Sequence, residues 1–199
     1  MSKFETLVQQ IHECTKCTLS QKRTRAVPGE GNLSADVVFI GEGPGFHEDQ
    51  QGRPFIGPAG KLLDELLESA GFNREEVYIT NMVKCRPPNN RDPLPGEIDA
   101  CRTYLEQQIA MIGPKVIVTL GRYSFSKFFP DIPIGKARGE PRNWEGITIF
   151  PMYHPAAALR NGGLRATLEK DFSELPKILA SKPPPLESQP EKSEQLSLF

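Results

Sequence analysis

The sequence predicts an α/β fold in which helices cover both faces of a parallel β-sheet. Four short apolar runs rich in β-branched residues have the length and composition of buried strands: residues 37–40, 76–80, 115–120 and 147–150. Segments with apolar residues at helical spacing alternate with these runs. Strands that alternate with helices form parallel sheets with the helices packed on both faces. We therefore expect four parallel strands between two helical layers.

The expected helices follow from apolar residues that recur every three or four positions. In the longest example, Ile98, Cys101, Leu105 and Ile109 mark one face of a helix. The expected helices cover residues 3–12, 61–67, 95–112, 123–129 and 164–180. Residues 18–34, 82–95 and 135–144 are expected to be loops, and each of these loops carries several cations.

Composition and length indicate a single globular domain. The chain has 199 residues, of which 38% are hydrophobic and 25% charged, which is enough to bury a core. The net charge of -1 argues against a general nucleic-acid binder, so a DNA site would have to be a local patch. No apolar run is long enough to span a membrane, and the start lacks a secretory signal. We expect a soluble, cytoplasmic monomer.

The composition changes at Ser181, which divides the chain into residues 1–180 and a tail, residues 181–199. Three consecutive prolines, followed by Glu, Ser, Gln and Lys, are typical of an extended, flexible linker. The last five residues nevertheless include three large apolar side chains: Gln195, Leu196, Ser197, Leu198 and Phe199. Exposed apolar residues on a polar tail suggest that a partner binds them.

The stretch of residues 36–60 is the most informative in the sequence. The strand at 37–40 stops at a glycine-rich turn, Gly41-Glu42-Gly43-Pro44-Gly45. Ligands of open α/β sheets bind beyond the carboxyl ends of strands, so Glu42 and the amides of Gly43 and Gly45 would face a ligand. The glycine spacing fits neither a dinucleotide-binding nor a P-loop pattern. A small flat ligand is the favoured interpretation, and a simple turn is the alternative.

The four cysteines predict a metal site. Cys14 and Cys17 form a C-x-x-C pair, and Cys85 and Cys101 lie far from them in the sequence. A low cysteine count in an intracellular chain argues against disulfides. Two thiolates at this spacing chelate one ion or cluster, and two more complete a four-thiolate site. Zinc and an iron–sulfur cluster remain open by ligand count alone, and buried unpaired cysteines are the alternative.

Several motifs, taken together, resemble the family 4 uracil-DNA glycosylases. These motifs are GEGPGFHEDQQGRPF at 41–55, YITNMVKCRPP at 78–88, PMYHPAAALRN at 151–161 and the four cysteines. The resemblance covers nearly all of residues 4–180. It implies the uracil-DNA glycosylase α/β/α fold with a four-stranded parallel sheet and a structural [4Fe–4S] cluster on Cys14, Cys17, Cys85 and Cys101. It also implies removal of uracil, the product of cytosine deamination, from DNA, as in base excision repair. Phe46 and His47 stand where acidic residues are frequent in the family.

By the same resemblance, Phe55, Asn81 and His154 would recognise the flipped uracil. Phe55 would stack on the base, and the Asn81 amide can pair with uracil O4 and N3–H, which cytosine cannot match. His154 would donate to O2, where negative charge develops as the base leaves. Without the family, Asn81 could be only a turn residue and His154 only a structural histidine.

Two carboxylates are candidates for the chemistry. Glu42 is the expected residue to position and activate the attacking water, and its charge would favour the cationic sugar. Glu48 would form the pocket wall at uracil C5, or could be a solvated loop acid. No lysine stands at a clear nucleophile position, so a monofunctional enzyme that leaves an abasic site is expected.

Two further interactions are expected with macromolecules. Leu159 and Arg160 could fill the gap left by the flipped base and contact the DNA backbone, although core packing is an equal alternative for Leu159. The segment Gln195-Leu196-Ser197-Leu198-Phe199 looks like the pentapeptide by which bacterial repair proteins dock on the sliding clamp.

The competing function is a non-catalytic binding module or a redox-sensing iron–sulfur protein on the same fold.

Overall fold

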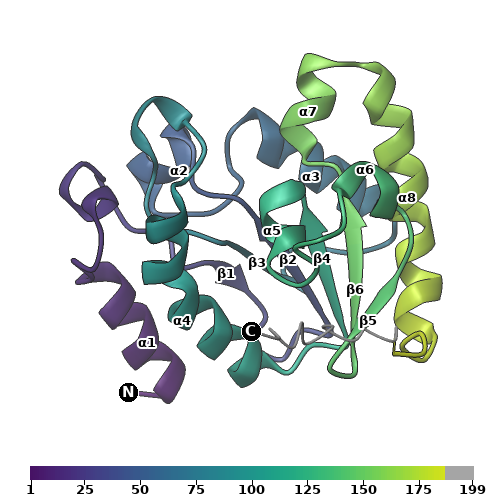
Figure 1. Ribbon diagram of the computed structural model, residues 1–199, viewed down its shortest axis with the longest axis horizontal. Helices are drawn as coiled ribbons and strands as arrows, with labels where there is room; N and C mark the ends of the chain where they lie inside the picture. Colours follow the sequence, from purple (N-terminus) through teal and green to yellow (C-terminus); the bar gives the residue numbers. More distant parts are fainter. Residues whose placement is uncertain (187–199) are drawn as a thin grey trace, which may run out of the picture.

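The computed structural model describes residues 1–186 and gives a sheet flanked by helices (Figure 1). The α-helices within this range are α1 (Lys3–His12), α2 (Phe46–Gln51), α3 (Pro58–Ser69), α4 (Pro95–Ile112), α5 (Arg122–Ser126), α6 (Ile134–Ala137), α7 (Pro155–Arg160) and α8 (Gly163–Ala180). Two short 3-10 helices are η1 (Thr18–Gln21) and η2 (Pro88–Asn90). Within residues 1–186, no helix is both long and apolar enough to cross a membrane.

The sheet has six strands rather than the four expected. They are β1 (Glu30–Gly31), β2 (Val37–Gly41), β3 (Tyr78–Asn81), β4 (Val116–Leu120), β5 (Arg142–Trp144) and β6 (Ile147–Met152), in the order β1-β3-β2-β4-β6-β5. The four central strands are parallel, as expected, and β1 and β5 pair antiparallel at the edges. Both edge strands are very short and at least partly exposed. They therefore lack the apolar run that marks the central strands.

Two hydrophobic cores explain why the central strands are apolar on both faces. Phe39 packs in the core under α3 and α8, whereas its neighbours Val38 and Ile40 pack in the core under α4, α5 and α6. Because successive side chains alternate between the faces, each strand contributes to both cores. The three-layer arrangement predicted from the sequence is confirmed.

Some short elements differ from the expectations. The helices α2, α6 and α7 lie in segments that were expected to be loops or were not assigned. Each has at most six residues, too few to display a helical repeat of apolar positions. α2 and α7 lie at the upper edge of the sheet in Figure 1, beyond the carboxyl ends of the parallel strands.

A third, smaller core joins the N-terminal helix to α4. Leu7 and Ile11 of α1 pack with Tyr104, Cys85 and Cys101, and Cys14 and Cys17 lie against this cluster. The two distant pairs of cysteines are therefore brought into one region.

Candidate active site

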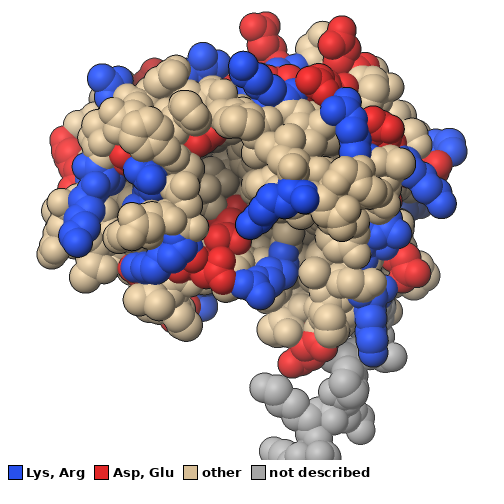
Figure 2. All heavy atoms as spheres, turned by 90° about the horizontal axis from the view of Figure 1, so that it is seen from above, with Lys and Arg blue, Asp and Glu red and all other residues tan. Residues whose placement is uncertain are grey.

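A cavity of about 410 Å³ opens at the carboxyl ends of β2, β3 and β6. Figure 2 looks down on this edge of the molecule, which is hollowed near its centre and carries several cations around the hollow. The cavity is lined by eight residues that the sequence predicted for the site: Glu42, Gly43, Gly45, Glu48, Phe55, Asn81, His154 and Arg160. It is also lined by residues that the sequence did not indicate: Pro44, Ala59, Pro87, Asn90, Arg91, Asp92 and Ala156. Its size suits a small organic ligand.

The end of β2 is kept free of side chains. A Cβ atom on Gly41 would lie 2.5 Å from Cζ of Phe55 and 2.4 Å from Oδ1 of Asn81. The absence of a side chain at Gly41 therefore lets both residues pack against the strand end. The chain then continues alongside β3, because the N–H of Val83 donates to the carbonyl of Glu42 (3.1 Å).

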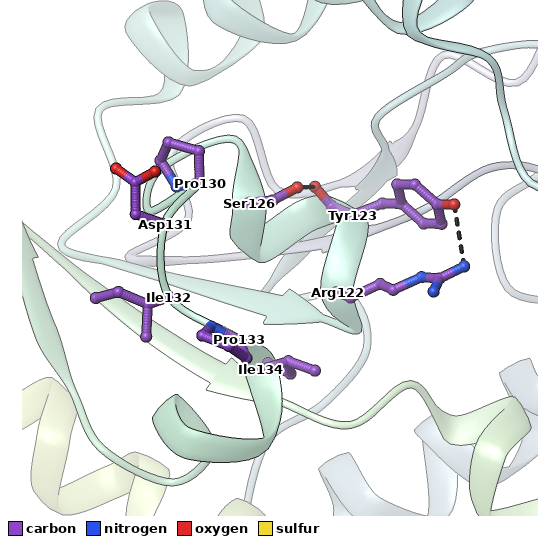
Figure 3. Close-up of a pocket in the computed structure, with 8 residues that line it drawn as sticks. All are labelled: Arg122, Tyr123, Ser126, Pro130, Asp131, Ile132, Pro133 and Ile134. Atoms are coloured by element: carbon purple, nitrogen blue, oxygen red, sulfur yellow. Dashed lines mark hydrogen bonds between the residues drawn. The ribbon is translucent and has the colours of Figure 1, made fainter.

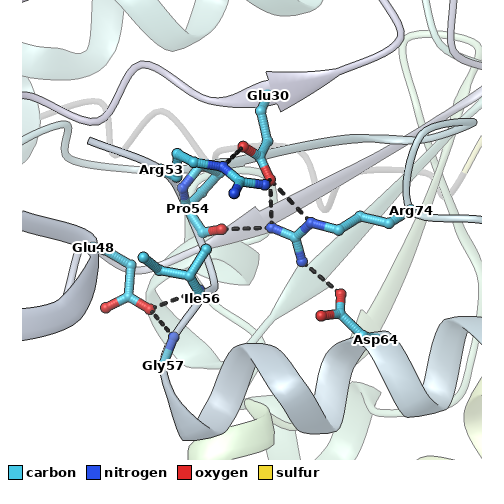
Figure 4. Close-up of polar contacts among 8 residues, drawn as sticks. All are labelled: Glu30, Glu48, Arg53, Pro54, Ile56, Gly57, Asp64 and Arg74. Atoms are coloured by element: carbon cyan, nitrogen blue, oxygen red, sulfur yellow. Dashed lines mark hydrogen bonds and ion pairs between the residues drawn. The ribbon is translucent and has the colours of Figure 1, made fainter. Parts of the chain in front are cut away.

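Phe55 lies between Pro54 and Ile56 in a loop that is anchored on both sides. Figure 4 shows the anchoring contacts of Pro54, Ile56 and Gly57. Its φ of 49° is unusual for a bulky residue and requires support from the surroundings. On one side, Oε1 of the buried Glu48 accepts from the amides of Ile56 (2.9 Å) and Gly57 (2.8 Å). On the other side, Arg74 donates to the carbonyl of Pro54 (2.5 Å). Glu48 is therefore not the solvated loop acid that the sequence left possible.

Arg74 is itself held in place by carboxylates. Its guanidinium donates to Glu30 (2.8 Å) and Asp64 (2.6 Å), and Glu30 also accepts from Arg53 (2.7 Å). Burial acts to raise the pKa of Glu30, but the hydrogen bonds from Arg53 and Arg74 leave that pKa below its usual value. No local pattern in the sequence indicated this network, because its members come from four separate segments.

The rings of Phe55 and His154 stack, with centroids 5.5 Å apart and planes 25° from parallel. Gly60, in the first turn of α3, permits this position of Phe55. A Cβ atom on Gly60 would lie 1.9 Å from the carbonyl oxygen of Phe55. The two aromatic side chains predicted from distant segments are thus brought together at the cavity.

His154 precedes α7 and serves as its N-cap. Its Nδ1 accepts a hydrogen bond from the N–H of Ala156 (3.1 Å). Burial, helped by the charge of Arg160, lowers the pKa of His154 to about 4, although the charge of Glu48 opposes this shift. The imidazole is therefore neutral at pH 7, and its proton resides on Nε2, the nitrogen that is free to donate.

Asn81 ends β3 and is buried, with a side-chain acceptor to spare. Among the described residues, Oδ1 of Asn81 has no hydrogen-bond partner. Its backbone carbonyl accepts from Nζ of Lys84 (2.8 Å), and Lys84 also donates to Thr80 (2.6 Å) and Gln108 (2.7 Å). A buried acceptor without a donor is unfavourable unless a ligand supplies one.

Glu42 is partly buried, and its pKa is raised. Burial is the main cause, and the charge of Asp92 adds to it, while Arg122 and Arg160 act in the opposite direction. Asp92 is held near the cavity by the hydroxyl of Tyr123 (2.7 Å) and the guanidinium of Arg122 (2.5 Å). Figure 3 shows the side chains of Arg122 and Tyr123 extending together from the start of α5. A carboxylate with a raised pKa can accept a proton from water near neutral pH.

Leu159 is exposed, with 52% of its surface accessible. The core-packing interpretation of this residue is therefore wrong. Its neighbour Arg160 lines the cavity, and Nε of Arg160 donates to the carbonyl of Ala156 (3.3 Å). The wedge role of Leu159 stays a prediction.

The four cysteines line a second, small cavity between α1 and α4. All four are free thiols, and none forms a disulfide. N–H groups donate to three of the sulfurs: Lys16 to Cys14 (3.5 Å), Arg23 to Cys85 (3.1 Å) and Lys84 to Cys101 (3.3 Å). Within residues 1–186, however, no group of three or more His, Cys, Asp or Glu side chains is arranged to hold a metal ion. The number and type of donors, four thiols around one cavity, are nevertheless those of a four-thiolate site.

An ion pair links the cysteine region to the cavity. Glu97, one turn before Cys101 on α4, accepts two hydrogen bonds from Arg91 (2.7 and 2.9 Å) and one from Thr18 (3.3 Å). Thr18 follows Cys17, and Arg91 lines the cavity. The sequence analysis missed this connection.

The last helix ends at Ala180, and the following segment returns to the edge of the sheet. The amide of Asn143 in β5 donates to the carbonyl of Pro184 (2.5 Å). The expected partner peptide, residues 195–199, lies outside the described residues.

Comparison with known proteins identifies the family of this chain. The model of the uracil DNA glycosylase superfamily matches residues 28–178. A type-4 uracil-DNA glycosylase of Saccharolobus solfataricus is 49% identical over 92% of this chain and 89% of its own. The type-4 enzyme of Archaeoglobus fulgidus is 44% identical over 94% of this chain and 98% of its own. That of Thermotoga maritima is 51% identical over 79% of this chain and 84% of its own.

The fold is thus that of the uracil DNA glycosylase superfamily. The chain belongs to the uracil DNA glycosylase superfamily and, within it, to the type-4 uracil-DNA glycosylases, and it is a hydrolase of that class. The resemblance seen in the sequence is confirmed.

Proposed function

We propose that this protein hydrolyses the N-glycosidic bond of uracil in DNA and leaves an abasic site, as the first step in the repair of deaminated cytosine. The observation that carries the proposal is the convergence of Glu42, Phe55, Asn81 and His154 on one cavity. A protein that only binds DNA has no need for a base-edge reader, a neutral donor and a partly buried acid in the same pocket.

Recognition of uracil is supported by the unpaired acceptor of Asn81. Uracil offers an N3–H donor and an O4 acceptor, which complement Oδ1 and the amide nitrogen of Asn81. Cytosine has an acceptor at N3 and an amino group at position 4, so both contacts would be unfavourable. The flipped base would lie against the ring of Phe55, which the surrounding loop holds firmly.

His154 is suited to stabilise the departing base. Its Nε2–H is a neutral donor, so it would stabilise the negative charge that develops on O2 more than the neutral ground state. The low pKa keeps the imidazole neutral at pH 7, so that Nε2 donates without a net positive charge on the ring.

Glu42 is the stronger candidate for the water-activating residue. Oε1 of the other cavity acid, Glu48, is already engaged by two backbone amides. The raised pKa of Glu42 makes it a better base, and its charge would favour the cationic sugar. Among the described residues, no lysine lines the cavity, which supports a monofunctional enzyme without a covalent lysine intermediate.

Cys14, Cys17, Cys85 and Cys101 would hold a [4Fe–4S] cluster, which when bound would link α1, the loop after β3 and α4. Burial raises the pKa of Cys101 to about 11, so its thiolate needs a positive partner to replace the proton. Analysis of the purified protein for iron and acid-labile sulfide tests this, and Cys14→Ser should lower both contents. Zinc without iron would contradict the cluster.

The terminal pentapeptide, Gln195-Leu196-Ser197-Leu198-Phe199, would dock on a bacterial sliding clamp. Deleting these residues should abolish clamp binding and leave turnover of short oligonucleotides unchanged. Equal clamp affinity with and without them would end this idea.

The central test uses a labelled oligonucleotide that contains one uracil, followed by alkali to cut abasic sites. The wild-type protein should give a cut strand, and Glu42→Ala and His154→Ala should remove most of it. Glu68→Ala and His12→Ala are matched controls, because both residues are exposed and lie outside the cavity. An uncut strand from wild-type protein with an intact iron–sulfur chromophore would instead favour a binding or redox role.

A further inference from the structure

Phe46 is an exposed aromatic residue at the rim of the cavity. It begins α2 and follows Gly45, which lines the cavity. Its accessible fraction is 52%, and among the described residues no other Phe, Tyr or Trp side chain is so exposed. Single exposed apolar side chains are common on protein surfaces, so the position of this ring next to a cavity-lining residue, and not its exposure alone, makes it a candidate for contact with a ligand.

Two neighbours hold the ring in a defined orientation. The guanidinium carbon of Arg86 lies 5.1 Å from the ring centroid, and the His47 ring meets Phe46 edge-on at 5.6 Å. Arg86 is itself oriented by a hydrogen bond from Nε to Oδ1 of Asn90 (2.7 Å), and Asn90 lines the cavity. The pair of Phe46 and Arg86 thus forms an ordered apolar and cationic surface beside the cavity mouth.

We propose that Phe46, supported by Arg86, is a stacking platform for the nucleobase next to the flipped uracil. The inference rests on the proposed function. When a base leaves the stack, its neighbour loses a stacking partner, and an aromatic ring can replace that partner for any base sequence. The positive charge of Arg86 would attract the adjoining phosphate. Phe46 would then bind the base beside the uracil, whatever its identity, rather than uracil itself.

The test is a double-mutant cycle between the protein and the DNA. Three single-stranded oligonucleotides carry one uracil with normal neighbours, with a tetrahydrofuran abasic analogue on its 5′ side, or with the analogue on its 3′ side. Loss of the stacked neighbour should lower kcat/KM of the wild-type protein by about 5- to 100-fold on one side. Phe46→Ala should lower kcat/KM similarly on the normal oligonucleotide but show no further loss with that analogue.

Two additional variants separate stacking from simple apolar contact. Phe46→Trp should behave like the wild type, and Phe46→Leu should behave like Phe46→Ala. Met111→Ala, which truncates an exposed apolar residue of α4, is the matched control and should match the wild type on all three substrates.

The proposal is overturned if Phe46→Ala keeps the wild-type kcat/KM on the normal oligonucleotide. It is also overturned if the losses of kcat/KM caused by Phe46→Ala and by the analogue multiply, or if Phe46→Leu behaves like the wild type on the three oligonucleotides. A wild-type protein that releases uracil from none of the three oligonucleotides, either single-stranded or annealed to a complementary strand, would refute the proposed function itself. Active wild-type protein without a Phe46 effect would refute only the platform.

Discussion

The N–H of Ala156 donates to Nδ1 of His154 across 3.1 Å and thereby fixes which ring nitrogen carries the proton. The contact is local, because both residues belong to the start of α7. Its consequence lies in the cavity, since Nε2 becomes a donor to whatever binds there. The chemistry of His154 therefore depends on a backbone group two residues away.

His154→Ala is expected to lower the single-turnover rate of uracil release by about 10²–10³-fold, the usual effect of removing one donor to a developing oxyanion. Substrate affinity should change much less, because the contact strengthens in the transition state. Rapid-quench measurements at saturating enzyme separate the two effects. His12→Ala should leave both unchanged, and a loss confined to affinity would contradict the assigned role.

The low pKa of His154 makes a second prediction, concerning stability. The folded-state pKa of about 4 lies below the usual 6.5, so protons bind the unfolded state more readily in that interval. The contribution of His154 to stability is complete above pH 6.5 and is lost progressively as the pH falls toward 4. Urea unfolding at several pH values should therefore show that the free energy of unfolding falls more steeply with decreasing pH for the wild type than for His154→Gln. Equal slopes would show that the ring titrates normally.

Asp92→Asn is expected to shift the pH profile of kcat/KM. Burial keeps the pKa of Glu42 high, and the charge of Asp92 raises it further. Glu42 must be ionised to act as a base, so the rate falls as the pH drops through its pKa. Removing the Asp92 charge should move this fall to lower pH. Asp131→Asn, beyond α5, is the control and should leave the pH profile unchanged. A shift to higher pH in Asp92→Asn would contradict the proposed effect of the Asp92 charge on Glu42.

Glu48→Gln should loosen the loop that carries Phe55. A neutral amide oxygen is a weaker acceptor for the amides of Ile56 and Gly57, and the free energy of unfolding should fall by about 1–3 kcal/mol. KM for uracil-containing DNA should rise, because Phe55 is no longer held in its unusual conformation. Chemical denaturation and steady-state kinetics measure the two effects. The exposed Glu68→Gln should be neutral in both assays.

Two glycine substitutions in helices should have opposite effects. A Cβ atom added to Gly96 in α4 would meet open space, so Gly96→Ala should raise stability by about 0.5–1 kcal/mol. Gly60→Ala places a methyl group 1.9 Å from the carbonyl oxygen of Phe55 and should destabilise the protein and abolish activity. Thermal unfolding compares them directly. A stable, active Gly60→Ala protein would mean that the Phe55 loop is not tightly constrained.

The layers of the fold and most of the site could be predicted from the amino-acid sequence alone. The four central strands are buried on both faces, so they appear as continuous apolar runs that need no knowledge of their neighbours. Glu42, Asn81 and His154 each lie at or just beyond the end of such a run. Parallel strands bring their carboxyl ends to one edge, which is the reason that Glu42 is expected to face a ligand. The resemblance to the family, and not the strand pattern, assigns Asn81 and His154 to the same site.

The support of the side chains in the site became visible only in three dimensions. The anchoring of Phe55 by Glu48 and Arg74, and the effect of Asp92 on Glu42, join residues from separate segments without any periodic pattern. The exposure of Phe46 likewise depends on what packs around α2. Hydrophobic periodicity reports only which face of an element is buried. The direction, partners and pKa of a polar side chain depend on the spatial arrangement of groups that are distant in the chain.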